Sequence, residues 1–477
     1  MRIFNILLIS VFLFTVSLFS QSDKENLKTA IDYLLRNDIF KSTNIGIDIY
    51  DLTADESLYQ LNEKMLFNPA SNMKLLTSAA GLVFLGPRYN FITSVIYTGD
   101  IVNTTLYGDI YIVGGFDPVF ETSDLNRFIT DIKKAGITEI TGDLYGDVSR
   151  KDSAFWGQGW MWDDDPSTDA PYLSALNINS NSIDVRVNGT EQGEKAEVIT
   201  SPATQYVKIF NSTITSSVYP QKIKITRDWR NRTNDIYVKG YILPPEFTSN
   251  DTIEYSLNIY KPELYFLTLF KEKLAASGIK FSGEIGLRQK PNSIKWLSVL
   301  SHEYDSVMVY MNKKSDNLSA EMTLYSLAAS FNTYPVSASE GLEVIDSLLT
   351  LCGVNDDYLL ADGSGVSRYN LLSAGQILSV LKYMYSNESN LFNIYYDSLP
   401  VAGVDGTLSE RMNGTGAEEK VHAKTGTLQG VSCLSGYVIS KNNHLIAFSV
   451  LEQNYVDKTA FARYIQDKIC ELLSKYE

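Results

Sequence analysis

Residues 89–295 have a different pattern of predicted secondary structure from the segments on either side of them, and this difference limits the folds that the chain can adopt. They consist of short β-prone runs, such as residues 95–97, 110–113 and 236–238, separated by Gly, Asn, Asp and Pro. The flanking segments show both helical and strand periodicity. The sequence therefore predicts a multi-domain α/β protein in which a large β-rich insertion interrupts the core.

The segment before the insertion predicts one strand and one helix. Residues 45–50 alternate apolar and other side chains, which is typical of a strand covered on one face. Residues 72–85 are rich in Met, Lys, Leu and Ala and end at Gly86-Pro87, a pair that commonly stops a helix. Ser71 is therefore expected at a helix N-terminus.

The segment after the insertion predicts the rest of the core. Helical periodicity covers residues 306–314, 318–329 and 340–351. Strand candidates follow at residues 422–428, 433–440 and 444–452, and a helix with one apolar face closes the chain at residues 461–473. We expect an antiparallel sheet flanked by helices, with the closing helix docked on it. An amphipathic anchor, and hence peripheral membrane association, is the alternative for that helix.

The N-terminus predicts export. Residues 3–19 form an apolar run that the polar residues 21–24 follow. A run of this length suits the core of a signal peptide better than a membrane span. We expect residues 1–20 to be a cleaved signal peptide, so that the protein is secreted across the inner membrane into the periplasm or cell envelope. A retained membrane anchor is the alternative.

Composition argues against several classes of function. The chain has 477 residues, of which 44% are hydrophobic and 20% charged, as in ordinary globular proteins. Its net charge of -15 argues against a nucleic-acid partner. Three cysteines allow at most one disulfide, and three scattered histidines lack the spacing of a zinc site. We expect no metal and no cofactor.

Ser71 and Lys74 are the first candidates for catalysis. On a helix, this spacing puts the lysine amine one turn from the serine hydroxyl. A serine is a weak nucleophile until a base lies within hydrogen-bond reach, and a buried lysine near other positive charge can be that base. The pattern is weak by itself, because residues 277–280 and 379–382 also match it, and an exposed helix surface would explain any one match.

Ser315-Asp316-Asn317 forms a second motif between two predicted helices. A hydroxyl at this point can relay a proton, and an amide can bind a substrate carbonyl. Capping of the next helix by Ser315 is the structural alternative.

Lys424-Thr425-Gly426 forms the third motif, on a predicted strand. The lysine and threonine can hold a carboxylate, while glycine lets a substrate backbone approach closely. A strand end with a surface lysine and a bulge is the structural alternative.

The three motifs occur in the order SxxK, SxN and KTG, each on the element that its role requires. They resemble the penicillin-binding protein and serine β-lactamase superfamily. Ser71 and Ser315 lie far apart in the sequence, which is similar to the low-molecular-mass class C D-Ala-D-Ala carboxypeptidase/endopeptidase family. Matching segments span nearly the whole mature chain: residues 69–74, 114–118, 314–317, 362–368, 404–408 and 424–430.

That resemblance implies a transpeptidase-like catalytic domain formed by residues 21–88 and 296–477. Residues 89–295 would form two nested domains, the inner one covering approximately residues 175–245. One position departs from the family pattern, since Phe116 stands where the family's glycine-rich turn has Gly.

The same resemblance implies an acyl-enzyme mechanism. Ser71 would attack the carbonyl of the penultimate D-Ala while Lys74 accepts its proton. The backbone N–H groups of Ser71 and Thr427 would hold the oxyanion. Ser315 and Lys424 would pass a proton to the leaving amine.

Other residues would contact the substrate. Asn317 would orient its amide, and Lys424 would share the terminal carboxylate with Thr425. The predicted substrate-binding residues are Thr425, Gly426, Thr427, Asp147, Arg368 and Gln429. For the last three, structural hydrogen bonds in loops are the alternative, and Arg368 in particular could pair with Asp362.

The predicted protein is therefore a serine-type carboxypeptidase or endopeptidase, a hydrolase that acts on the peptides of cell-wall peptidoglycan. β-Lactam antibiotics would inhibit it by acylating the same serine, because their strained amide mimics the D-Ala-D-Ala bond. A β-lactamase or an esterase on the same fold, and a non-catalytic cell-wall binding protein, are the alternatives.

Overall fold

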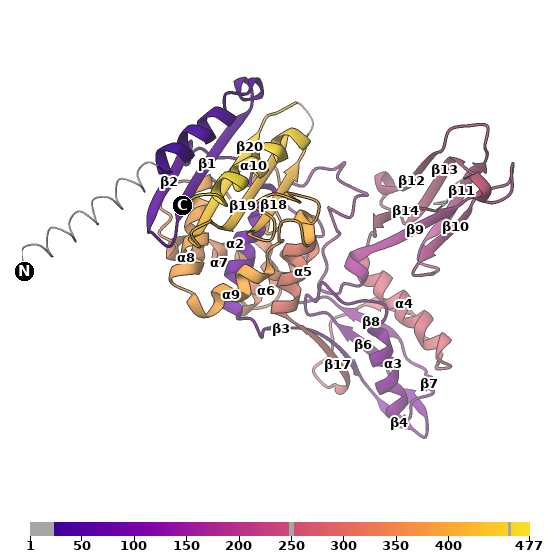
Figure 1. Cartoon of the computed structure of the whole chain (residues 1–477). Helices are drawn as coiled ribbons and strands as arrows, with labels where there is room; N and C mark the ends of the chain where they lie inside the picture. The colour runs from indigo at the N-terminus through magenta and orange to yellow at the C-terminus, as the bar shows by residue number, and fades with distance from the viewer. Residues whose placement is uncertain (1–22, 248–251, 457–458) are drawn as a thin grey trace, which may run out of the picture. The chain divides into compact units, whose positions relative to one another are not determined.

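The computed structural model describes residues 23–247, 252–456 and 459–477 (Figure 1). The predicted signal peptide, residues 1–20, lies outside the described residues. Contacts divide the chain into two compact units. The first unit comprises residues 23–87, 308–316 and 342–477, and the second comprises residues 88–307 and 317–341.

A five-stranded antiparallel sheet forms the centre of the first unit, in the order β18-β19-β20-β1-β2. Its strands are β1 (Asn44–Asp51), β2 (Glu56–Leu61), β18 (Val421–Leu428), β19 (Val431–Ile439) and β20 (Leu445–Gln453). The predicted strands are present, and β18, which carries the third motif, lies at one edge of the sheet. This edge position leaves half of its backbone groups available to other partners.

Helices cover both faces of this sheet. The closing helix α10 (Thr459–Leu473) packs on β19 and β20, as Figure 1 shows, and its Ile465 and Ile469 join the same hydrophobic core as Ile47 of β1. The helix at residues 23–34 contributes to that core as well. Docking of the closing helix on the sheet is thus confirmed. Other helices of this unit are α2 (Met73–Ala80), which is fully buried, α8 (Ala374–Ser386), which packs on the opposite sheet face, and α9 (Ser389–Ser398).

Three further helices match the predictions to within two residues at each end. They are α5 (Tyr304–Lys314), α6 (Asn317–Phe331) and α7 (Ala338–Leu351). Short helical turns complete the chain: η1 (Asp38–Lys41), η2 (Ala70–Asn72), η3 (Gly81–Leu85), η4 (Asn179–Asn181), η5 (Trp229–Asn231), η6 (Pro245–Phe247) and η7 (Gly406–Leu408).

The second unit is rich in strands, and its described residues form four sheets. The larger two have the orders β16-β8-β6-β3-β17 and β15-β7-β5-β4. Their strands are β3 (Asn90–Tyr97), β4 (Asp100–Val102), β5 (Thr105–Tyr107), β6 (Ile110–Val113), β7 (Glu139–Ile140), β8 (Leu144–Asp147), β15 (Lys280–Phe281), β16 (Ile285–Leu287) and β17 (Lys295–Glu303). Helices α3 (Leu125–Lys134) and α4 (Pro262–Ala276) share their hydrophobic core.

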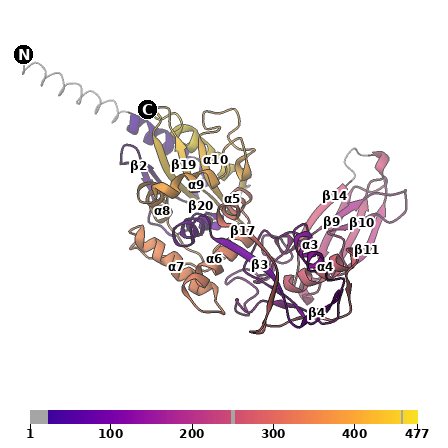
Figure 2. The same cartoon turned by 90° about the horizontal axis from the view of Figure 1, so that it is seen from below.

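Two three-stranded sheets complete the second unit; Figure 1 labels all six of their strands, and Figure 2 shows β9, β10, β11 and β14 from another side. Their strands are β9 (Ser182–Asn188), β10 (Glu197–Ser201), β11 (Lys208–Thr215), β12 (Lys222–Arg227), β13 (Asp235–Ile242) and β14 (Thr252–Asn258). The predicted multi-domain α/β class with a β-rich insertion is confirmed, while the residue limits of the domains stay a prediction. Across the described ranges, none of the helices combines the length and apolar character needed to cross a bilayer.

Candidate active site

Ser71 lies in the tight turn η2, which leads directly into α2. The predicted helix at residues 72–85 is present as α2 followed by η3. Ala70 adopts a left-handed φ of 45°, and its N–H donates to Asn68 Oδ1 at 2.9 Å. This bend keeps Ser71 half-exposed, whereas every residue of α2 is buried.

Lys74 points its amine at the Ser71 hydroxyl. Its Nζ donates to Ser71 Oγ at 3.0 Å and to the carbonyl oxygen of Ser364 at 2.7 Å. The side chain is 0% exposed. Two fixed acceptors and complete burial hold the amine in the position required of a base for Ser71.

The segment from Asp362 to Ser367 wraps around this turn. The Asp362 carboxylate accepts from the N–H groups of Gly365 at 2.8 Å and Ser367 at 2.7 Å. Gly365 has a φ of 86°, and a Cβ there would lie 1.8 Å from the Ala70 carbonyl oxygen. The loop therefore needs glycine at this position to support the backbone of Ser71.

Lys424 of β18 reaches the second motif. Its Nζ donates to Ser315 Oγ at 2.9 Å and to the Thr425 carbonyl oxygen at 3.0 Å. Burial, together with the charge of Lys74, lowers the pKa of Lys424 well below its ordinary value. The structure thus joins Ser71, Lys74, Ser315 and Lys424 within the first unit, and the surface lysine considered for the third motif is excluded because Lys424 is 0% exposed.

Asn317 begins α6 in the second unit, two residues after Ser315 in the chain. Its Nδ2 donates to the carbonyl oxygen of Asp169 at 2.6 Å, and the residue is 8% exposed. The loop containing Asp169 therefore orients the Asn317 amide.

The outer edge of β18 presents backbone donors. The Ala423 N–H donates away from β19, to the Pro400 carbonyl oxygen at 2.9 Å. Because N–H directions alternate along an antiparallel strand, those of Thr425 and Thr427 point to the same outer edge. The Thr425 hydroxyl also lies on this side and donates to Thr407 Oγ1 at 2.7 Å.

Gly426 brings β18 against the Ser71 turn. A Cβ on Gly426 would lie 2.9 Å from the Pro69 carbonyl oxygen and 3.1 Å from the Ala70 Cβ. Any side chain would therefore force the strand away from η2. This close approach places the outward N–H of Thr427 on the strand that adjoins Ser71, as an oxyanion site requires.

Arg368 and Gln429 lie together in the first unit. Arg368 Nη1 donates to the Gln429 carbonyl oxygen at 3.2 Å. The alternative in which Arg368 pairs with Asp362 is wrong, because the Asp362 carboxylate instead accepts from backbone N–H groups of its own loop and from Asn370 Nδ2 at 2.6 Å.

Asp147 ends β8 in the second unit and is 2% exposed. Its Oδ1 accepts from the Ser149 N–H at 3.0 Å, and its Oδ2 accepts from the Lys290 N–H at 2.9 Å. Both oxygens are engaged within the unit, which fits the structural alternative. A substrate contact by Asp147 stays a prediction.

The competing SxxK match at residues 379–382 has ordinary structural contacts. Ser379 Oγ donates to the Gly375 carbonyl oxygen at 2.9 Å, one turn back along α8. The Lys382 amine lies 3.3 Å from the centre of the Tyr50 ring. These two side chains thus serve the packing of α8.

Sequence reasoning missed several residues that position the site. Asn72 Nδ2 donates to Ser435 Oγ at 2.6 Å, and Ser435 donates to Ser449 Oγ at 2.9 Å, which ties the nucleophile turn to the centre of the sheet. The Ser364 carbonyl was also missed. The one sequence signal near Ser364 is the pair of glycines on either side of it, which indicates a tight loop.

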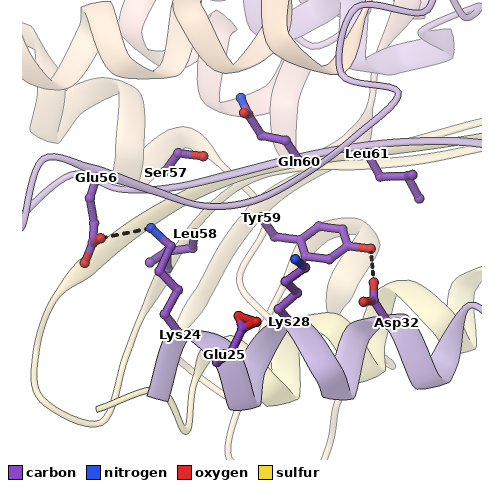
Figure 3. Close-up of a pocket in the computed structure, with 10 residues that line it drawn as sticks. All are labelled: Lys24, Glu25, Lys28, Asp32, Glu56, Ser57, Leu58, Tyr59, Gln60 and Leu61. Atoms are coloured by element: carbon purple, nitrogen blue, oxygen red, sulfur yellow. Dashed lines mark hydrogen bonds and ion pairs between the residues drawn. The ribbon is translucent and has the colours of Figure 1, made fainter. Parts of the chain in front are cut away.

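A hollow of about 910 Å³ lies elsewhere in the first unit, between the helix at residues 23–34 and β2 (Figure 3). Two of its polar contacts are internal: Lys24 Nζ donates to Glu56 at 3.0 Å, and Tyr59 Oη donates to Asp32 at 2.7 Å. None of the three motifs contributes to its lining. In the part of the chain that the structure describes, no cluster of three or more His, Cys, Asp or Glu could hold a metal ion.

An α/β fold with a serine, a buried lysine whose amine contacts the serine hydroxyl, and a second Lys–Ser pair is the arrangement of serine hydrolases of the penicillin-binding class. The family model for D-Ala-D-Ala carboxypeptidase 3 (S13) matches residues 27–476. The chain therefore belongs to the D-Ala-D-Ala carboxypeptidase 3 (S13) family, and the predicted family is confirmed.

Relatives agree with this membership along the length of the chain. A D-alanyl-D-alanine carboxypeptidase of Actinomadura sp. (strain R39) is 31% identical over 469 residues, covering 94% of this chain and 85% of the relative. The solved structure of penicillin binding protein 4 from Haemophilus influenzae is similar with a TM-score of 0.82 and 26% identity, covering 94% of this chain and 99% of that one. A peptidoglycan endopeptidase of Bdellovibrio bacteriovorus shares the fold, at 16% identity and a TM-score of 0.53 over 90% of this chain and 92% of that one.

Proposed function

We propose that this protein is a serine D,D-carboxypeptidase that hydrolyses the bond after the penultimate D-Ala of peptidoglycan stem peptides, through an acyl-enzyme on Ser71. The hydrogen bond from Lys74 Nζ to Ser71 Oγ at 3.0 Å carries this proposal, because it pairs a nucleophile with a buried base. The names of the relatives at high coverage support D-Ala-D-Ala carboxypeptidase activity. Endopeptidase activity would use the same acylation step with a different leaving group.

In the acylation step, Lys74 removes the proton from Ser71 as the hydroxyl oxygen bonds to the substrate carbonyl carbon. A base must be neutral to accept a proton, and burial of two repelling ammonium groups disfavours the state in which Lys74 and Lys424 are both charged. The backbone N–H groups of Ser71 and Thr427 stabilise the developing oxyanion. Each donor of this kind is worth about 10²–10³ in rate.

In the collapse of the tetrahedral intermediate, the proton passes from Lys74 through Ser315 to the leaving amine. Lys424, which donates to Ser315 Oγ at 2.9 Å, keeps that hydroxyl aligned. The C–N bond breaks, D-Ala leaves as the free amine, and the acyl group stays on Ser71. Water then hydrolyses the ester and restores the hydroxyl.

Substrate recognition falls to the residues on the outer edge of β18 and beside it. Thr425 and Lys424 hold the terminal carboxylate, and Gly426 admits the substrate backbone. Asn317 binds the substrate amide, and its hydrogen bond to Asp169 fixes its orientation. Arg368 and Gln429, which contact each other, form a further polar contact for the stem peptide.

β-Lactams are proposed to acylate Ser71 as inhibitors. A β-lactam complex has been solved for penicillin binding protein 4 of Haemophilus influenzae, which is 25% identical to this chain with a TM-score of 0.77. A β-lactam amide is a strained analogue of the D-Ala-D-Ala bond and fits the same acylation step.

The proposed organisation follows from the same family. Residues 21–88 and 296–477 form the catalytic domain, and residues 89–295 form nested inserted domains, the inner one at approximately residues 175–245. Residues 1–20 act as a signal peptide, which places the enzyme in the periplasm or cell envelope with its peptidoglycan substrate. Peripheral association with the membrane is not part of the proposal, since the apolar face of α10 packs on the sheet.

Release of D-Ala from a stem pentapeptide ending in D-Ala-D-Ala tests the function. The protein beginning at residue 21 should release one D-Ala per peptide, Ser71→Ala should release none, and Ser379→Ala, from the competing SxxK match, should match the wild type. Turnover of a chromogenic cephalosporin at a steady rate, without D-Ala release, would instead make the protein a β-lactamase. Cleavage of a crosslinked peptide dimer in a parallel reaction assigns the endopeptidase activity.

A further inference from the structure

The chain contains five tryptophans, and four of them line one pocket of the second unit. The pocket has a volume of about 740 Å³, within the range of small-molecule sites. Its lining consists of Phe155, Trp156, Trp160, Trp162, Asp165, Tyr172, Trp229, Arg230 and Arg232. No step of the proposed mechanism uses these side chains.

One indole ring of this pocket is open to solvent, and it lies beside a partly exposed one. Trp162 is 68% exposed, and its ring centre lies 4.9 Å from that of Trp229 with an interplanar angle of 42°. Phe155 is 39% exposed and stacks on Tyr172. Clustered aromatic faces that folding leaves uncovered are typical of binding sites.

Two arginines add positive charge to the aromatic walls. Arg230 lies over the Trp229 ring at 5.4 Å, and Arg232 lies over the Phe155 ring at 5.0 Å. Neither forms an ion pair with a carboxylate among the residues that the structure describes. In a chain with a net charge of -15, two guanidinium groups stacked on rings but not neutralised favour an anionic ligand.

A buried polar network fixes the floor of the pocket. Arg227 is 1% exposed, forms an ion pair with Asp165 and donates from Nη2 to Asn258 Oδ1 at 2.8 Å. Tyr172 Oη donates to Asp165 Oδ2 at 2.7 Å. Because these groups satisfy one another, the aromatic walls are held in place before any ligand arrives.

We propose that this pocket binds an N-acetylated amino sugar that carries a free carboxylate, as muramic acid does at positions of a peptidoglycan glycan strand that bear no stem peptide. The faces of Trp162 and Trp229 suit the C–H face of a sugar ring, while Arg230 and Arg232 suit the carboxylate. The choice of peptidoglycan as the source rests on the proposed function, but the complementarity of rings and charge does not.

The loop that carries two of the pocket's tryptophans is hydrogen-bonded to a residue of the second motif, Asn317. Asp169 lies in the same loop as Trp160 and Trp162, and its carbonyl oxygen accepts from Asn317 Nδ2 at 2.6 Å. A glycan held by the tryptophans would therefore immobilise the loop that orients the Asn317 amide. This gives the inserted unit a role in positioning a polymeric substrate.

Isothermal titration of the full mature chain with the disaccharide N-acetylglucosaminyl-N-acetylmuramic acid tests the proposal. The wild type should bind, and Trp162→Ala should bind about tenfold more weakly, since it removes one exposed stacking face. Trp296→Ala is the matched control, because Trp296 is 65% exposed and lies outside the pocket on β17. It should bind as the wild type does.

The arginines are tested by comparing ligands. The double variant Arg230→Gln with Arg232→Gln should lose affinity for the muramic acid disaccharide but keep that for the uncharged N-acetylglucosamine dimer. Equal binding by the wild type and Trp162→Ala, or no binding by the wild type, would overturn the proposal, as would binding of a stem peptide alone at this pocket. The Ser71→Ala protein should bind the disaccharide normally, so failure of the proposed catalysis and failure of this site are distinguished.

Discussion

Lys424 Nζ and Ser315 Oγ lie 2.9 Å apart, although one belongs to the edge strand β18 and the other to the turn between α5 and α6. Lys424 is fully buried, and its environment includes the charge of Lys74. Two buried lysines and two half-exposed serines thus share one site. Catalysis depends on which of these four side chains carries a proton at each step.

Lys424→Met should reveal the lowered pKa of Lys424. Between the lowered pKa of Lys424 in the fold and the ordinary lysine value of about 10.4, the unfolded chain binds more protons than the folded one. This residue therefore makes the wild type more stable as the pH rises through that interval. Methionine carries no charge. The free energy of unfolding of the variant relative to the wild type should therefore fall from pH 7 to pH 10 in urea titrations. A constant difference over that range would mean that Lys424 titrates normally in the fold.

Lys74→Met should slow acylation while leaving the fold intact. The side chain keeps its length but loses the amine that contacts Ser71 Oγ, and removal of a general base typically reduces the rate by about 10²–10⁴. Stopped-flow measurement of acylation by benzylpenicillin checks this. The control is Lys382→Met on α8, which belongs to the competing SxxK match and should acylate at the wild-type rate. Equal loss in both variants would point to general destabilisation.

Gly365→Ala should slow acylation as well as lower the stability of the protein. Its φ of 86° disfavours any side chain, and the new Cβ would meet the Ala70 carbonyl oxygen at 1.8 Å. Displacement of the Ser71 turn by about 1 Å can reduce the rate about 10²-fold. Gly353→Ala is the control, since Gly353 has a φ of 73° with nothing within 4 Å of its Cβ position. Both variants should lose stability, but only Gly365→Ala should acylate slowly.

Phe116 offers a test of the one departure from the family pattern. It has a left-handed φ of 66°, is 1% exposed and stacks on Tyr325 with ring centres 5.7 Å apart. Phe116→Ala should destabilise the protein by about 3–5 kcal/mol. Phe116→Gly should destabilise it by about 1 kcal/mol less, because glycine relieves the left-handed strain. Thermal unfolding of the two variants shows which is more stable. A Phe116→Ala protein that is more stable than Phe116→Gly would contradict the prediction.

The sequence predicted the fold because its motifs and periodicity are local. The alternation at residues 45–50 and the helical run at residues 72–85 depend on neighbouring side chains, and both elements are present. The left-handed backbone at Phe116 was signalled only by the glycine expected there.

Contacts between distant segments could not be predicted in this way. A backbone carbonyl has no sequence signature, so the acceptor role of Ser364 toward Lys74 was invisible. An ion pair between Arg368 and Asp362 was one alternative for Arg368, yet Arg368 contacts Gln429, which the antiparallel turn after β18 brings close. The tryptophan pocket likewise combines residues 155–172 with Trp229, which only the folded second unit brings together.

The mass of the intact protein after incubation with benzylpenicillin shows whether Ser71 is the residue that becomes acylated. The chain beginning at residue 21 should gain one penicilloyl adduct per molecule, and Ser71→Ala should gain none, while Ser379→Ala gains it as the wild type does. An adduct on the Ser71→Ala protein, or none on the wild type, would contradict the assignment of Ser71 as the acylated nucleophile.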